Sequence, residues 1–282
     1  MTAGVVFPEG GLLVEPYILV WLGALLFLNL IRFNASDLLS TFARPRQLAL
    51  LSAVKLLVLP LAMYGIANLI YEPFALSVLL LSGVSTGLGA PFVVNLIGGR
   101  LQVVVGMIIA TSIAVPFVLP SIVFVLVGSV IDIPILEMVL LLSAALFTPL
   151  ASGWLAKKYW PAASGFADRN SFPLSLVFVV LINFGMFAKF SGYFYTEHTF
   201  LVQIIATAFL CYAAYCLAGY LTSAGSRNER AAGVISMTYI NNVLVAVLAF
   251  QFFGPAVAAL AALYNIPYYA GIVAIKKVVS KT

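Results

Sequence analysis

The sequence predicts an all-α polytopic membrane protein. Of its residues, 63% are hydrophobic and 8% are charged, and the mean hydropathy is +1.14, far from the averages of soluble proteins. Apolar runs of about 20 residues, the length that crosses a bilayer core, recur along the whole chain. We predict nine transmembrane helices, at 12–31, 48–70, 74–97, 102–128, 134–156, 172–190, 199–222, 231–253 and 255–275.

The charges between these runs predict an orientation. Lys and Arg are enriched in cytoplasmic loops. With the N-terminus outside, one side of the membrane carries most of the cations, and the other keeps Lys189 and most of the acidic residues. We therefore expect an outside N-terminus and a cytoplasmic C-terminus, in the inner membrane if the source is bacterial. The predicted cytoplasmic cations are Arg32, Arg44, Arg46, Arg100, Lys157, Lys158, Arg169, Arg227, Arg230, Lys276, Lys277 and Lys281.

The third run is interrupted by small and helix-breaking residues between 83 and 91. In hydrocarbon every backbone N–H and C=O needs a partner, so a membrane span is normally one continuous helix. Broken helices form the binding sites of secondary transporters near the bilayer midplane. This segment therefore predicts a carrier. The residues expected to break the helix are Gly83, Gly87, Gly89 and Pro91.

A second interruption, Met237–Asn242, lies in the eighth run. The third and eighth spans are five helices apart, and a displacement of five helices reverses orientation in the membrane. This spacing predicts an inverted-topology repeat of four plus five helices with two discontinuous crossing helices. Pro116 and Pro120 are expected to bend or break the fourth span.

Lys55 is the most informative single residue, because it lies about seven residues into the second span. A lysine near the bilayer centre costs about 2.5–3.5 kcal/mol, and such residues usually face the interior of the helix bundle. The alternative is that its long stem carries the amine back to the lipid headgroups. We expect Lys55 to belong to a substrate or ion site.

Other polar side chains in the interrupted spans and the fourth span are candidates for the same site. Serine and threonine in membrane helices often only bond to their own backbone, whereas adjacent asparagines in an apolar helix need partners or water. The interruptions favour a role in a cavity. The predicted substrate- or ion-binding residues beside Lys55 are Ser85, Thr86, Thr111, Ser112, Ser236, Thr238, Asn241 and Asn242.

Enzyme chemistry is poorly supported. The only histidine, His198, falls in a predicted outer loop, so a histidine-based metal site or catalytic triad cannot form within the membrane. The sequence contains no phosphate-binding loop. We expect no catalytic residue, no metal, no cofactor and no nucleic-acid partner; the expected partners are a small solute and the lipid bilayer.

Three groups of residues resemble the bile acid:sodium symporter family over nearly the whole chain, beginning at the family's second helix. They are Pro16–Ile18 followed by Asn34–Leu38 and Arg44–Pro45, the break region Leu81–Arg100, and Val234–Asn242. The resemblance implies a core domain of spans 2–4 and 7–9 (48–129 and 193–282) with both crossing helices, and a panel domain of spans 1, 5 and 6 (1–47 and 130–192). It further implies that substrate binds between the domains and moves by alternating access. It describes a divergent, bacterial-type member that lacks the family's first helix.

The sequence departs from the family at its sodium ligands. The family's glutamate in the second crossing helix aligns with Ser236, and its nearby glutamine with Ile240. Its serine–asparagine pair aligns with Pro91–Phe92, and its later hydroxyl ligands fall near Val104 and Ile108. A further glutamine ligand aligns with Lys55. A fixed ammonium there would occupy the sodium position and join the broken helices.

The resulting prediction is a secondary transporter of a small organic, anionic solute that works without sodium. A sodium-coupled bile acid or organic anion symporter that uses backbone carbonyls is the first alternative, and coupling to protons stays open. An arsenite-type exporter is disfavoured because neither crossing helix contains a cysteine. A non-transporting membrane receptor with the same fold is the alternative from another functional class.

Overall fold

A computed structural model describes residues 2–30, 45–128, 132–223 and 225–272. Within these residues the secondary structure is helical, and the only extended pairing is one isolated bridge. Six of the described helices are long and apolar enough to cross a membrane, which supports the prediction of an integral multi-pass membrane protein. They are Pro8–Leu28, Pro45–Ile70, Leu101–Val127, Ile135–Tyr159, Ser171–Lys189 and His198–Thr222.

The chain divides into two compact units, Met1–Ala35 with Leu140–Val202, and Ser36–Val139 with Gln203–Thr282. In the first unit α12 packs against α1, α2 and α3, and Lys189 donates to Glu15 at 2.6 Å. The helices that lie wholly or mainly in this unit are α1 (Thr2–Val6), α2 (Pro8–Val14), η1 (Glu15–Tyr17), α3 (Ile18–Leu30), α10 (Ile135–Tyr159), α11 (Pro161–Arg169), α12 (Ser171–Lys189) and α13 (Ser191–Thr196).

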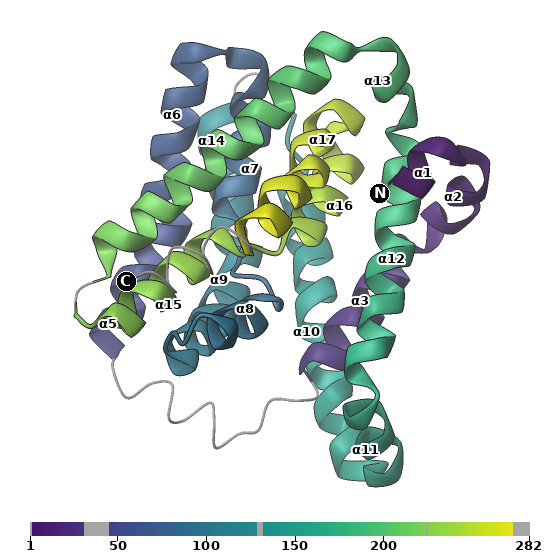
Figure 1. Cartoon of the computed structure of the whole chain (residues 1–282), viewed down its shortest axis with the longest axis vertical. Helices are drawn as coiled ribbons and strands as arrows, with labels where there is room; N and C mark the ends of the chain where they lie inside the picture. Colours follow the sequence, from purple (N-terminus) through teal and green to yellow (C-terminus); the bar gives the residue numbers. More distant parts are fainter. Residues whose placement is uncertain (1, 31–44, 129–131, 224, 273–282) are drawn as a thin grey trace. The chain divides into compact units, whose positions relative to one another are not determined.

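The second unit contains the predicted site. Its helices before residue 128 are α5 (Pro45–Ala53), η2 (Val54–Val58), α6 (Leu59–Ile70), η3 (Glu72–Phe74), α7 (Ala75–Gly83), α8 (Ala90–Leu96) and α9 (Leu101–Val127). Its later helices are α14 (His198–Thr222), most of which lies in this unit, α15 (Arg227–Thr238), α16 (Asn242–Phe253), α17 (Pro255–Leu263) and a helical stretch at 265–272. Both α8 and α9 lie beside α15 (Figure 1).

Two of the predicted spans in this unit consist of two helices each. α7 and α8 are joined by non-helical backbone at 84–89, and α15 and α16 by residues 239–241. α9, in contrast, is continuous through Pro116 and Pro120, so of the two expected effects, a bend or a break, these prolines do not produce a break in the fourth span. A proline removes one donor from a helix, but the rest of the helix still bonds internally and packs on its neighbours.

A proline also accompanies an irregular turn in the second span. Residues Val54–Val58 form a π-helical turn, η2, between α5 and α6, and Pro60 follows it in the first turn of α6. The proline ring would clash with the carbonyl four residues earlier, and a wider turn relieves such a clash. Lys55 lies in this turn.

Candidate functional site

The two interrupted spans pair through their backbones. Thr86 and Ile240 form an isolated antiparallel bridge. The N–H of Gly87 donates to the carbonyl of Tyr239 at 2.7 Å, and the N–H of Asn241 donates to the carbonyl of Ser85 at 2.9 Å. Each break therefore satisfies backbone groups of the other, as a low-dielectric environment requires.

Gly87 is required for this close approach. A Cβ atom at position 87 would collide with the carbonyl group of Ile240. The other predicted helix-breaking residues surround it: Gly83 is the last residue of α7, Gly89 precedes α8, and Pro91 lies in the first turn of α8. A proline fits a first turn because its missing N–H has no partner within the helix there.

The end of α15 presents four consecutive carbonyls, from Ser236 to Tyr239, and each accepts a hydrogen bond from another segment of the unit. The last carbonyls of a helix lack partners within the helix, and the negative end of the helix dipole lies there. The donors are Thr86 Oγ1 to Ser236 (2.8 Å), Lys55 Nζ to Met237 (3.2 Å), Tyr264 Oη to Thr238 (2.8 Å) and Gly87 N to Tyr239 (2.7 Å).

Lys55 is the only one of these four donors with a formal charge. Its side chain is 0% exposed, so its amine does not reach out to the headgroups from this unit. The ammonium also lies 5.2 Å from the centroid of the Tyr215 ring, within range of a cation–π interaction. The Tyr215 hydroxyl is in turn hydrogen-bonded to Ser82 Oγ at 2.7 Å. The positive charge is thus held at the C-terminal end of α15.

The predicted hydroxyl residues lie around this centre, mostly with internal partners. Thr111 donates to the carbonyl of Met107 and accepts from the N–H of Thr86 at 3.0 Å. The remaining hydroxyls of α15 donate one turn back along their own helix, Ser236 to Ala232 and Thr238 to Val234, both at 2.8 Å. In this conformation the Thr111 hydroxyl supports the first break, and the hydroxyls of Ser236 and Thr238 are satisfied within α15.

Two other predicted hydroxyls are not tied to the pairing of the breaks through their side chains. Ser85 Oγ is buried and has no hydrogen-bond partner among the residues that the structure describes. Ser112 is half-buried on α9.

The two asparagines of the second break make different contacts. Asn241 caps α16, because its Oδ1 accepts from the N–H of Leu244 at 3.3 Å. Asn242 Nδ2 donates to Asn265 Oδ1 at 2.7 Å. Sequence reasoning missed Asn265 as well as Tyr264; the signal for Asn265 was a lone amide in an apolar run, two residues before Pro267.

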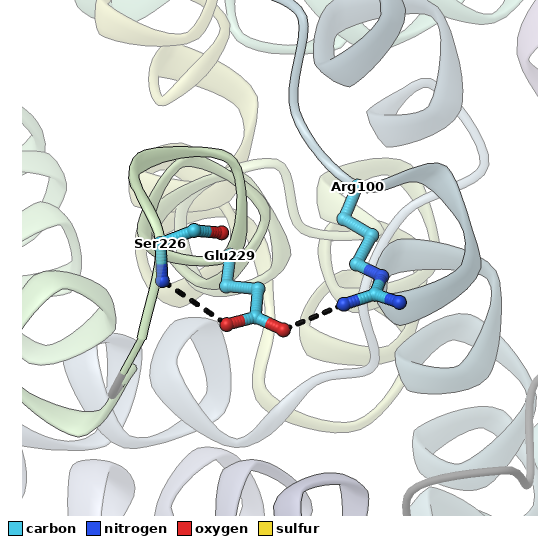
Figure 2. Close-up of polar contacts among 3 residues, drawn as sticks. All are labelled: Arg100, Ser226 and Glu229. Atoms are coloured by element: carbon cyan, nitrogen blue, oxygen red, sulfur yellow. Dashed lines mark hydrogen bonds and ion pairs between the residues drawn. The ribbon is translucent and has the colours of Figure 1, made fainter.

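A second polar cluster joins the end of the first broken span to the start of the second (Figure 2). Arg100 Nη1 donates to Glu229 Oε1 at 2.6 Å, and the backbone N–H of Arg100 donates to the carbonyl of Asn228 at 3.1 Å. The other oxygen of Glu229 accepts from the N–H of Ser226 at 3.1 Å, within a capping box that begins α15. The two broken spans are therefore linked both at their breaks and at this end.

Comparison with known proteins gives the family. The model of the sodium bile acid symporter family matches residues 19–197, which include the first break and end before the second. No curated protein matches the sequence. The matched residues make up more than half of the chain, so the chain belongs to this family, as its sequence motifs predict. A transporter of the bile acid or organic anion type is the function that the family indicates.

Proposed function

We propose that this member of the sodium bile acid symporter family is a secondary transporter that moves a small organic anion by alternating access without sodium. The Lys55 ammonium takes the place of the sodium ion. The observation that carries the proposal is the bond from Lys55 Nζ to the Met237 carbonyl at the end of α15. A cation at a helix C-terminus is favoured by the helix dipole, whether it is an ion or a side chain.

The oxygen atoms around Lys55 already have hydrogen-bond partners, which supports transport that does not require sodium. A hard cation requires several oxygen ligands. The four carbonyls from Ser236 to Tyr239 already accept hydrogen bonds from protein donors, and the Ser236 hydroxyl donates within its own helix. Sodium coupling through these carbonyls, the main alternative, would require sodium to displace those donors.

Two features favour an anionic solute. Lys55 is buried without a carboxylate partner among the described residues, so its charge contributes a positive potential that no protein anion cancels locally. The second feature is the N-terminus of α16, a 12-residue helix that begins at Asn242, because helix N-termini attract negative groups.

We also propose the membrane orientation and the domain roles. The N-terminus lies outside and the C-terminus in the cytoplasm. The unit with both breaks serves as the core domain, and the unit with α12 serves as the panel domain. Of the cations that predict the orientation, Arg32, Arg44, Lys276, Lys277 and Lys281 lie outside the described residues.

Flux into proteoliposomes tests this function. Organic anion uptake should have the same initial rate in sodium and in choline buffer, and it should be lost in Lys55→Gln, which keeps a polar side chain but removes the charge. Uptake that requires sodium would favour the symporter. Anion binding to the purified protein without any flux would favour the receptor.

A further inference from the structure

We infer that the junction of α10 and α11, residues 154–172, binds the headgroup of an anionic phospholipid. Both helices lie wholly or mainly in the first unit, and α10 is one of the six described helices that are long and apolar enough to cross a membrane. The end of such a helix lies at the depth of the lipid headgroups. The junction is outside the broken spans, so the inference does not depend on the transported solute.

Lys158 is the cation at the centre of this surface. It is exposed, and its Nζ atom lies 5.1 Å from the centroid of the Trp154 ring and 5.2 Å from that of the Tyr159 ring. Both distances are within range of a cation–π interaction, which holds the long side chain against the rings while its charge stays accessible. Aromatic rings carry no net charge. The ammonium of Lys158 is therefore positioned but not neutralised by these contacts.

The lysine at the end of α12 differs in this respect. Lys189 is the last residue of α12, and it forms an ion pair with Glu15 at 2.6 Å. Its charge is neutralised by a carboxylate of the same unit, whereas Lys158 is held by aromatic rings. The two lysines therefore give opposite expectations for an external anion, which Lys158 should attract and Lys189 should not.

Exposed aromatic side chains accompany Lys158 along the junction. Tryptophan and tyrosine concentrate at the boundary between hydrocarbon and headgroups, because part of each side chain is apolar and part forms hydrogen bonds. The indole N–H is a donor that a phosphate oxygen can accept. The aromatic side chains of the junction that are more than half exposed are Trp154, Tyr159, Trp160, Phe166 and Phe172.

The charges of the junction favour an anionic lipid over a zwitterionic one. Between residues 157 and 169 the sequence has three cations, Lys157, Lys158 and Arg169, against one acidic residue, Asp168. The phosphate of a lipid would face Lys158, and its acyl chains would cover the exposed aromatic rings. A choline headgroup would add a second cation beside Lys158. In the proposed orientation this end of α10 faces the cytoplasmic leaflet, where anionic lipids give a negative surface potential.

Thermal melts of the full-length protein in detergent test the inference. Phosphatidylglycerol and phosphatidylcholine with identical acyl chains would be titrated separately, and the lipid concentration at half-maximal stabilisation gives an apparent affinity. The wild type should bind phosphatidylglycerol about fivefold more tightly or better, since one basic residue at an anionic surface corresponds to about that factor. Equal affinity for the two lipids would overturn the inference.

Two matched lysine variants locate the site. Lys158→Gln should weaken the binding of phosphatidylglycerol about fivefold and leave that of phosphatidylcholine unchanged, and Lys158→Arg should keep the wild-type preference. Lys189→Gln removes the same charge from the ion-paired lysine and should leave both affinities unchanged. Each titration is referred to the lipid-free melting temperature of its own variant, so a change in stability does not alter the comparison. An unchanged affinity in Lys158→Gln, or an equal loss in Lys189→Gln, would overturn the inference.

The deacylated headgroup separates a lipid from a free anion. Glycerophosphoglycerol has the phosphate of phosphatidylglycerol without its acyl chains. It should not stabilise the wild type at the concentrations at which phosphatidylglycerol saturates, because the exposed aromatic rings would remain uncovered. Stabilisation equal to that by phosphatidylglycerol would mean that the junction binds a free phosphate compound, and it would overturn the assignment to a lipid.

Discussion

Gly87→Ala is the substitution that most directly perturbs the pairing of the two breaks. The added Cβ would collide with the carbonyl oxygen of Ile240 and lie 2.7 Å from its carbonyl carbon. Both groups are backbone, so no side-chain rotation relieves the collision. The breaks must separate, and the bonds from Gly87 to Tyr239 and from Asn241 to Ser85 must lengthen.

The expected loss of stability follows from these contacts. Overpacking of a buried site costs about 1–3 kcal/mol. Each of the two backbone hydrogen bonds contributes about 0.5–1.5 kcal/mol. The sum is about 2–6 kcal/mol, or a fall in melting temperature of about 4–24 °C, taking the roughly 2–4 °C per kcal/mol of proteins of comparable size.

The assay compares melting temperature and anion flux of Gly87→Ala with those of a glycine control. Gly65 lies in α6 of the same unit, and a Cβ there would meet nothing within 4 Å. Because alanine is the better helix former by about 1 kcal/mol, Gly65→Ala should be neutral or stabilising. If Gly87→Ala melts and transports like the wild type, the breaks do not pair as described.

Two further predictions concern the ends of α15. Tyr264→Phe removes the donor to the Thr238 carbonyl and should cost about 1–3 kcal/mol in a thermal melt, whereas the exposed Tyr269→Phe should change little; equal melting of both variants would contradict the role of the Tyr264 hydroxyl. Arg100→Gln removes the ion pair between Arg100 and the buried Glu229 and should lower the melting temperature most at low salt, since screening already weakens the pair at high salt. A loss that is independent of salt would argue against an electrostatic role for Arg100.

Much of this arrangement could be predicted from the sequence because it depends on local composition. Hydropathy locates the apolar helices, and a run with Gly87, Gly89 and Pro91 cannot continue as a regular helix at low cost. A lysine within an apolar run must find partners inside the protein or reach the surface, so Lys55 was identifiable as a candidate from its position alone.

The partners themselves could not be predicted, because they are fixed by long-range packing. Lys55 and Met237 are 182 residues apart, and Arg100 and Glu229 are 129 apart. Tyr264 has the sequence signature of an ordinary packing aromatic, yet it donates to a free helix carbonyl. The continuity of α9 through its prolines shows the reverse case, in which tertiary packing overrides a local breaking signal.

The central claim is that Lys55 occupies the position of the sodium ion, and the thermal stability of the wild type in sodium tests it most directly. The purified protein would be melted across millimolar sodium chloride, with choline chloride at equal ionic strength as the control. The account predicts the same melting temperature in both salts at every concentration. Sodium-specific stabilisation at millimolar concentration would mean that the ion still binds, and it would contradict the replacement of sodium by Lys55.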